Sequence, residues 1–347
     1  MATQASGSKF SYELIRNKKR ITGHSVFLTM PEEHYPGLEV VYTDVTSKTG
    51  WERIILTKPS NKNGKLPIVV FLTGIGCYSL DTPFDTTKAE IQMLNKLSRA
   101  GYICARVEKP GMGDNIGKSK KCEEIGFNDE VDMYIQAVNK LKKRADIDSN
   151  EVYLFGHSMG GVIAPIVSRQ TPVKGIIAYG TIGSTFIDYL NKTRRTIAQA
   201  YNMPPDTADL YVKDYCECAA YYFVEKMSTL QATSKKADCK DYLSVFDYRS
   251  RTYNDEMYSV NIPAEWKTFS GNALLIWGSG DYISSKDDHQ LVTDAVNYFH
   301  PGHAQFVILP NTTHGMLYAT DFVQARTNPG AYNPEVGNTV LQWLQKN

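Results

Sequence analysis

The stretch Val152-Tyr-Leu-Phe-Gly156-His157-Ser158-Met159-Gly160-Gly161 decides the fold. An apolar run of strand type leads directly into the pattern G-x-S-x-G, and an apolar helix start follows it. A serine on such a sharp turn takes up a strained backbone conformation that carries its Oγ clear of the chain. Glycine is needed at 156 and 160 because a Cβ there would clash. The positive end of the following helix faces the same point. The pattern predicts that Ser158 is a nucleophile.

Apolar runs and helical patterns alternate on both sides of this turn. The spacing of Thr87 and Glu90 predicts a capping box for a helix that Gly101 ends, and a stripe from Val131 to Leu141 indicates another helix. A last helix is expected to include 340–344. Strands are expected at 38–42, 51–56, 68–72, 102–107, 152–155, 273–277 and 305–309. This rhythm predicts an α/β fold with a doubly wound, mostly parallel sheet.

The alternation of apolar runs and helical patterns stops between residues 184 and 261. This segment reads as helical, and it holds ten of the 22 tyrosines of the chain. We predict a helical, Tyr-rich lid at 184–261, inserted between two parts of the α/β core at 1–183 and 262–347. The alternative is a helical subdomain whose tyrosines only support its own packing.

A serine hydroxyl is a weak nucleophile near neutral pH and needs a base, most often histidine. His314 directly follows the run at 305–309, and loops at the carboxyl ends of strands are where ligands bind in open α/β sheets. His157 lies inside the turn and is expected to point away from Ser158. His300 and His303 fit a solvated turn better than a metal site. We therefore expect His314 to be the base.

An orienting carboxylate is expected after the preceding strand. The segment Gly278-Ser-Gly-Asp281 supplies one directly after the run at 273–277. Asp281 would hold the imidazole in one tautomer and stabilise the imidazolium. Asp287 and Asp288 are rivals, but they read as capping residues at the start of a helix.

The composition excludes several other classes of function. Lys and Arg number 38 and Asp and Glu 37, so the net charge of +1 argues against broad electrostatic capture of nucleic acid or of an anionic membrane. No apolar run approaches the roughly 18 residues of a membrane span.

We expect neither a metal nor an organic cofactor, because zinc-ligand spacings and a dinucleotide fingerprint are both missing. Residues 1–10 lack the apolar core of a signal peptide, so the protein is either cytoplasmic or made with a signal that is removed.

Together these motifs resemble those of the α/β-hydrolase superfamily, from about residue 37 to the end of the chain. Within it they are similar to serine hydrolases of the esterase and prolyl-oligopeptidase-like branch. The resemblance lies in the serine turn, in Glu108-Lys-Pro-Gly-Met-Gly113-Asp114, in Gly278-Ser-Gly-Asp281, and in the chain order Ser158, Asp281, His314. It implies an acyl-enzyme on Ser158.

The resemblance also implies an oxyanion hole with two backbone donors. One is the N–H of Met159, and the other is the N–H of Ile75 in the loop that follows the strand at 68–72. Thr73 stands where relatives commonly have histidine, so the choice between Ile75 and Gly76 stays open.

Six cysteines are too few for a disulfide scaffold. In the fold that the resemblance implies, the strands at 68–72 and 102–107 are neighbours, which brings Cys77 near Cys122. A bridge there would brace the oxyanion loop and would imply an oxidising compartment. Cys216 or Cys218 with Cys239 is a second candidate pair, and the sequence leaves both pairings open.

The expected function is hydrolysis of a carboxylic ester of a small or medium organic substrate. One alternative is a peptidase that removes short N-terminal units and holds the α-ammonium group with Asp214, Glu217 or Glu225. Others are a thioesterase or acyltransferase of a biosynthetic pathway, whose lid excludes water, and a binding protein that kept the fold without the chemistry. The natural substrate and the oligomeric state cannot be read from the sequence.

Overall fold

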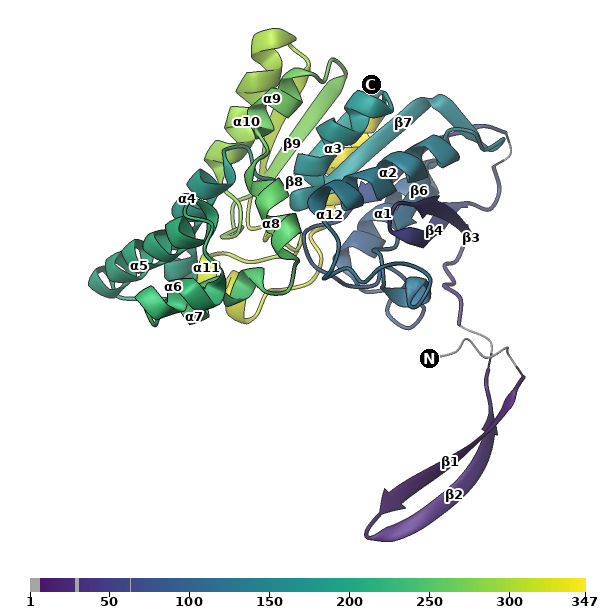
Figure 1. The fold of residues 1–347 in the computed structure, drawn as a ribbon. Helices are drawn as coiled ribbons and strands as arrows, with labels where there is room; N and C mark the ends of the chain where they lie inside the picture. The colour runs from purple at the N-terminus through teal and green to yellow at the C-terminus, as the bar shows by residue number, and fades with distance from the viewer. Residues whose placement is uncertain (1–6, 29–30, 63) are drawn as a thin grey trace.

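The main sheet has eight strands in the order β10-β9-β8-β7-β5-β6-β4-β3 (Figure 1). We describe residues 7–28, 31–62 and 64–347 of a computed structural model. All neighbouring pairs from β10 to β6 are parallel, whereas β4 pairs antiparallel with both β6 and β3. The predicted α/β fold with a doubly wound, mostly parallel sheet is confirmed.

The strands of the main sheet are β3 (Leu38–Ser47), β4 (Gly50–Pro59), β5 (Leu66–Leu72), β6 (Ile103–Val107), β7 (Ile147–His157), β8 (Gly175–Tyr179), β9 (Asn272–Gly278) and β10 (Ala304–Leu309). The helices are α1 (Ala89–Ala100), α2 (Phe127–Leu141), α3 (Met159–Gln170), α4 (Phe186–Ala200), α5 (Pro205–Phe223), α6 (Thr229–Lys235), α7 (Cys239–Leu243), α8 (Arg251–Tyr258), α9 (Ile262–Lys267), α10 (Lys286–Phe299), α11 (Phe322–Thr327) and α12 (Pro334–Leu344). Two short 3₁₀ turns are η1 (Gly113–Asn115) and η2 (Ser244–Phe246).

Helices cover both faces of the sheet, because successive residues of a buried strand point to opposite sides. Val70 of β5 packs with α2 and α3, whereas its neighbours Val69 and Phe71 pack with α1 and α12. α10 lies on the same side as α2 and α3. None of the helices described here combines the length and the apolar character that crossing a membrane requires.

Most expected elements are present, but two details of the prediction fail. All seven expected strands form, but the five-residue strand β8 was not predicted. The prediction of a capping box at Thr87 is wrong. Its hydroxyl donates to Asp85 at 2.6 Å, and α1 begins without a side-chain cap. Gly101 does end α1, in the left-handed region at φ 117°.

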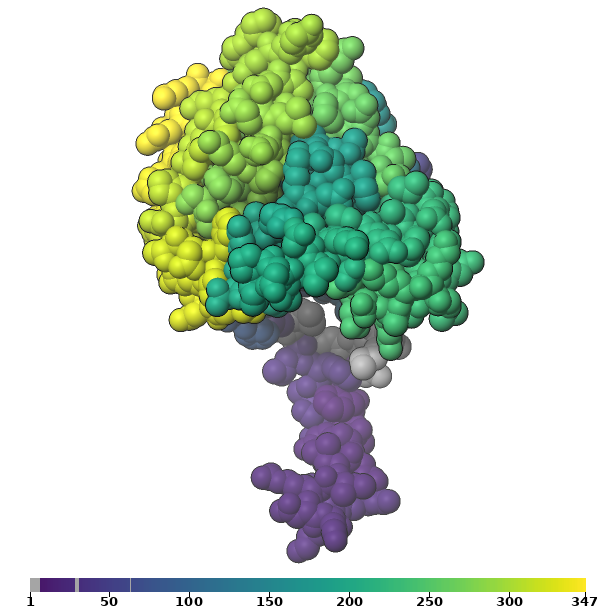
Figure 2. All heavy atoms as spheres, turned by 90° about the vertical axis from the view of Figure 1, so that its left-hand side faces the viewer, coloured from purple at the N-terminus to yellow at the C-terminus, as the bar shows by residue number. Residues whose placement is uncertain are grey.

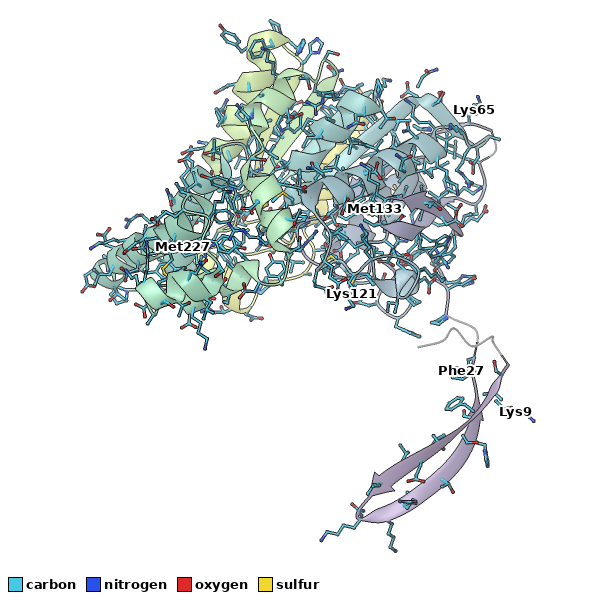
Figure 3. All side chains as sticks on the ribbon, in the orientation of Figure 1. Lys9, Phe27, Lys65, Lys121, Met133 and Met227 are labelled. Atoms are coloured by element: carbon cyan, nitrogen blue, oxygen red, sulfur yellow. A yellow bond between two sulfur atoms is a disulfide. The ribbon has the colours of Figure 1, made fainter. Side chains whose placement is uncertain are left out.

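A separate hairpin precedes the sheet and was also not predicted. Its strands are β1 (Lys9–Arg16) and β2 (Lys19–Val26), joined at Asn17 and Lys18 with φ of 52° and 60°. Two positive φ angles suit a two-residue hairpin turn. Figure 2 shows the hairpin standing away from the body, and Figure 3 shows the side chains of Lys9 and Phe27 projecting from this arm.

The segment between β8 and β9 forms an insertion of helices that we call the helical insertion (α4 to α9). A disulfide joins Cys218 on α5 to Cys239 on α7, while Cys216 is a free thiol. Many of its aromatic rings pack against one another: Tyr211 and Tyr215 both contact Tyr242 in edge geometry. These three rings help to pack the insertion.

Candidate active site

Ser158 lies on a sharp turn between β7 and α3. Its backbone has φ 55° and ψ −120°, an uncommon conformation for a residue with a side chain. The turn closes because Gly156 and Gly160 lack a Cβ: an added Cβ on Gly156 would overlap the backbone of Gly160, and one on Gly160 would overlap the backbone of Leu72. The local sequence thus places the Ser158 hydroxyl at the carboxyl edge of the parallel strands.

Asp281 and His314 meet at the same edge. Asp281 follows β9, His314 follows β10, and Nδ1 of the imidazole lies 2.8 Å from Oδ2 of the carboxylate. Because the carboxylate accepts, Nδ1 carries the proton and the outer nitrogen, Nε2, is left as the basic atom. The His314 side chain is 20% exposed, so the imidazole is not sealed off from solvent.

The carboxylate of Asp281 is fully buried but well supplied with donors. Oδ1 accepts from the N–H groups of Ile283 and Ser284 at 2.8 and 2.9 Å, and the Ser284 hydroxyl donates to Oδ2 at 2.6 Å. Burial by itself would raise the pKa of Asp281, but the charge of His314 and these hydrogen bonds outweigh burial and lower the pKa below its usual value. Asp281 is therefore an anion that faces the imidazole.

Two neighbours of Ser158 hold the loop that carries His314. The Ser158 N–H donates to the carbonyl of Tyr179 at 2.9 Å, and the Tyr179 hydroxyl donates to the carbonyl of Thr313 at 2.6 Å. Nε2 of His157 donates to the carbonyl of His314 at 2.9 Å, with the two rings 4.9 Å apart between centroids. The described residues give the Ser158 Oγ no hydrogen bond, and such bonds often tighten only when substrate is bound.

Gly180 lies directly behind the imidazole. It has φ 61°, and a Cβ added there would lie 2.9 Å from Nδ1 of His314 and 3.2 Å from Oδ2 of Asp281. Only glycine leaves room for this pair of side chains. The sequence analysis did not identify this position, although a glycine directly after the short apolar run of β8 is a usable signal.

The loop after β5 lies beside the serine. A Cβ on Gly74 would be 3.2 Å from Cβ of Ser158 and 3.5 Å from its Oγ. The N–H groups of Ile75 and Gly76 donate to no described residue, and Met159, as the first residue of α3, has an N–H without an acceptor inside the helix. The loop beside Ser158 and the residue that follows it thus carry backbone N–H groups without a described acceptor.

Charged residues to which the sequence analysis gave no role bind the backbone of this loop. Lys109 donates to the Gly74 carbonyl at 2.6 Å, and Arg249 donates to the Ile75 carbonyl at 2.7 Å. Both cations also bind the buried carboxylate of Glu130 on α2. We call Lys109, Glu130 and Arg249 the ion cluster.

A disulfide between Cys77 and Cys122 also fixes the loop, with a Cα–Cα distance of 5.8 Å. The bridge joins the end of the loop after β5 to the segment that follows β6. The sheet places β5 and β6 side by side. Of the cysteine pairs that the sequence left open, the structure therefore contains Cys77–Cys122 and Cys218–Cys239.

The rival residues have other roles. Asp288 lies in the first turn of α10, where its N–H donates to Ser285, and its Oδ1 accepts from the N–H and hydroxyl of Ser184. His300 and His303 each face a backbone carbonyl. Within the ranges described above, no three metal-ligating side chains gather at one point.

Comparison with known proteins gives a partial match to a curated relative. Esterase EstD of Thermotoga maritima is 25% identical over 115 residues, which cover 33% of this chain and 27% of EstD. The match thus spans well under two thirds of that relative.

Solved structures match over most of the chain. Est1E from Butyrivibrio proteoclasticus with bound ferulic acid superposes with a TM-score of 0.56 at 13% identity, covering 88% of this chain and 98% of that one. The esterase Pf2001 of Pyrococcus furiosus gives a TM-score of 0.54 at 13% identity, covering 91% and 95%. At such identities these likenesses concern the fold alone.

Residues 69–325 match the model of the Alpha/beta hydrolase family. That match covers most of the chain, which therefore belongs to the alpha/beta hydrolase family.

Proposed function

We propose that the protein is a serine esterase that cleaves carboxylic esters of small or medium organic substrates through an acyl-enzyme on Ser158. The observation that carries this proposal is the hydrogen bond of 2.8 Å between Nδ1 of His314 and Asp281, at the strand edge where Ser158 lies. It leaves Nε2 of His314 as a base for the serine hydroxyl.

In the proposed reaction, Nε2 of His314 takes the proton of Ser158 as Oγ attacks the ester carbonyl. The N–H groups of Met159 and Ile75 stabilise the oxyanion of the tetrahedral intermediate. The intermediate collapses, the C–O bond to the alcohol breaks, and His314 protonates the departing alkoxide. Water then attacks the acyl-enzyme with His314 again as base, which releases the acid and restores Ser158.

The acidic side chains that a peptidase would need already have lysine partners. Lys236 lies 2.5 Å from Asp214 and 2.8 Å from Glu217, and Lys235 lies 3.0 Å from Glu225. Carboxylates paired in this way are poor partners for the α-ammonium group of a peptide. Their pairing favours an ester over a peptide with a free N-terminus.

We further propose that the helical insertion acts as a lid over the proposed active site. Tyr189 on α4 supports this role: burial is the main cause that raises the pKa of its phenol, and the charge of Asp281 adds to it, so the ring is within electrostatic reach of the proposed active site. The ring also packs against Phe186, a buried residue of the same helix. A cover rich in tyrosine would suit an acyl or alkoxy group of mixed character better than a long alkyl chain.

The test combines a probe with a substrate series. A fluorophosphonate should label the wild-type protein and fail to label Ser158→Ala, and hydrolysis of p-nitrophenyl esters should fall about 10⁴-fold or more in that variant. Ser168→Ala is the matched control, because Ser168 is a buried serine of α3 outside the turn. Faster turnover of aminoacyl p-nitroanilides than of the esters would overturn the esterase proposal, and labelling that survives in Ser158→Ala would exclude Ser158 as the nucleophile.

A further inference from the structure

The ion cluster binds the carbonyl groups of Gly74 and Ile75 in the loop after β5. Lys109 and Glu130 have no solvent exposure, and Arg249 is 3% exposed. Lys109 Nζ lies 2.5 Å from one oxygen of Glu130, and Arg249 lies 2.8 Å from the other. Two cations and one anion give the cluster a formal charge of +1 (2 − 1). A buried ion pair is often no more stabilising than apolar packing, so stability alone does not account for three buried charges.

The two cations contact consecutive carbonyl groups of one loop. In a trans peptide the C=O and the N–H point in opposite directions, and the described chain contains no cis peptide. The carbonyl of Gly74 shares its peptide plane with the N–H of Ile75, so Lys109 turns the Ile75 N–H away from the cluster. In the same way Arg249, which holds the carbonyl of Ile75, turns the N–H of Gly76 away from the cluster.

The same contacts strengthen the donors. A cation that bonds to an amide oxygen polarises the amide and makes its N–H a better donor to an anion. Burial lowers the pKa of Lys109 to about 8 against the opposing pull of Glu130, so the ammonium group is still mostly charged at neutral pH. Burial also works against ionisation of Glu130, but the charges of Lys109 and Arg249 outweigh it and lower its pKa.

We propose that Lys109 and Arg249 are positioning residues for the oxyanion hole, with Glu130 as the bridge that fixes both of them. Lys109 aims the N–H of Ile75, and Arg249 aims the N–H of Gly76. The proposal rests on the proposed function of Ser158, and it makes the helical insertion, which carries Arg249, part of the support of that site.

The cluster allows single substitutions that leave no unpaired buried charge. Lys109→Met leaves Arg249 paired with Glu130, and Arg249→Met leaves Lys109 paired with Glu130. Both variants are therefore expected to fold. Arg249→Lys keeps one donor and should recover part of what Arg249→Met loses.

The matched control removes a buried ion pair elsewhere. Arg106 binds Glu33 through both terminal nitrogens, and its other hydrogen bonds go to Leu80 and Thr57 rather than to Gly74, Ile75 or Gly76. The double variant Glu33→Gln/Arg106→Met should lower the melting temperature while reaction at Ser158 stays within threefold of wild type.

The readouts are kcat and KM for a p-nitrophenyl ester, the melting temperature, and the second-order rate of labelling by a fluorophosphonate. Phosphonylation of serine also places charge on an oxygen in the oxyanion hole, so the labelling rate is informative whatever the natural substrate is.

If Ile75 is the second donor, Lys109→Met should lower kcat and the labelling rate by about 10²- to 10³-fold, with KM within threefold of wild type. If Gly76 is the donor, Arg249→Met should show that loss instead.

Each outcome decides the proposal. If both Met variants keep kcat and the labelling rate within threefold of wild type while their melting temperatures fall, the ion cluster is only structural and the proposal is wrong. If the wild-type protein is labelled at Ser158 but hydrolyses no ester, the esterase proposal fails while the labelling rates still test the ion cluster. Folded wild-type protein that is not labelled at all would overturn both.

Discussion

Nε2 of His157 donates to the backbone carbonyl of His314 across 2.9 Å. The residue directly before the proposed nucleophile thus holds the residue proposed as its base. Removal from water is the main cause that lowers the pKa of His157 to about 4, so this ring is neutral over the pH range in which esterases are assayed. The bond is a fixed support of the site and does not titrate with it.

Replacing His157 by Phe should lower kcat by about tenfold, because the His314 carbonyl loses a partner and a small displacement of a reacting group is costly. His157→Gln keeps an N–H donor and should retain more activity. Steady-state kinetics on a p-nitrophenyl ester would measure both variants. Equal kcat in the His157→Phe variant and the wild-type protein would show that the carbonyl of His314 needs no such support.

Gly180→Ala should reduce kcat by about 10²-fold or more, because the added methyl group would push the imidazole away from Asp281. The control is Gly302→Ala. Gly302 also has positive φ, at 83°, but a Cβ there meets nothing within 4 Å. Gly302→Ala therefore carries a similar backbone strain without the contact to His314. If both variants lose stability and activity to the same degree, backbone strain rather than displacement of the ring is the cause.

Loss of the Cys77–Cys122 disulfide should destabilise the fold by about 4 kcal/mol in the chain-entropy model, and loss of Cys218–Cys239 by about 3 kcal/mol. These values follow from sequence separations of 45 and 21 residues. Urea unfolding of the two double Cys→Ser variants would measure both.

The kinetic effects of the two bridges should differ. The Cys77–Cys122 bridge follows the loop that carries Ile75, so its removal should also lower kcat, whereas removal of Cys218–Cys239 should leave kcat nearly unchanged. A larger fall in kcat on removing the bridge of the helical insertion would contradict this assignment.

Glu52→Gln should stabilise the protein at pH 8 and not at pH 4.5. Glu52 is buried, and burial raises its pKa to about 7 from an ordinary value of 4.5. Because the folded state binds this proton more tightly than the unfolded chain, its contribution is complete below about pH 4.5 and is lost as the pH rises through 7. Glutamine mimics the protonated form at every pH.

Melting temperatures of wild type and Glu52→Gln from pH 4.5 to 8 would check this dependence. Glu123→Gln is the control, because Glu123 is an exposed glutamate. The prediction fails if the advantage of Glu52→Gln is the same at both ends of the range.

The positions of Ser158, Asp281 and His314 could be predicted because each follows an apolar run that becomes a parallel strand, and the carboxyl ends of parallel strands share one edge. The hairpin β1–β2 was not predicted: its turn residues Asn17 and Lys18 include no glycine, although Lys9 to Leu14 of β1 alternate strictly between polar and apolar residues. β8 was also missed, although its apolar run is as long as others from which strands were predicted.

The ion cluster was missed for a different reason. Lys109 and Arg249 lie 140 positions apart on loops, and only the tertiary structure brings them together. Glu130 did leave a signal. It lies three residues after Phe127 and four before Tyr134, on the buried face of α2. A carboxylate on an apolar helix face predicts a buried cation partner, although sequence alone does not say which one.

If the helical insertion is the lid proposed above, its contacts limit how a bulky substrate can enter. Arg249 is bonded to the β5 loop, the Ser250 hydroxyl donates to the carbonyl of Ile125 at 2.7 Å, and Glu256 accepts from the N–H of Asn128 at 2.9 Å. A flap that swung open as one rigid piece would break all three tethers and would pull on the loop beside Ser158. Opening that spares them must hinge before residue 249, and lifting α4 would also break the hydrogen bonds from Thr196 to the Tyr282 carbonyl and from Arg326 to the Ala200 carbonyl.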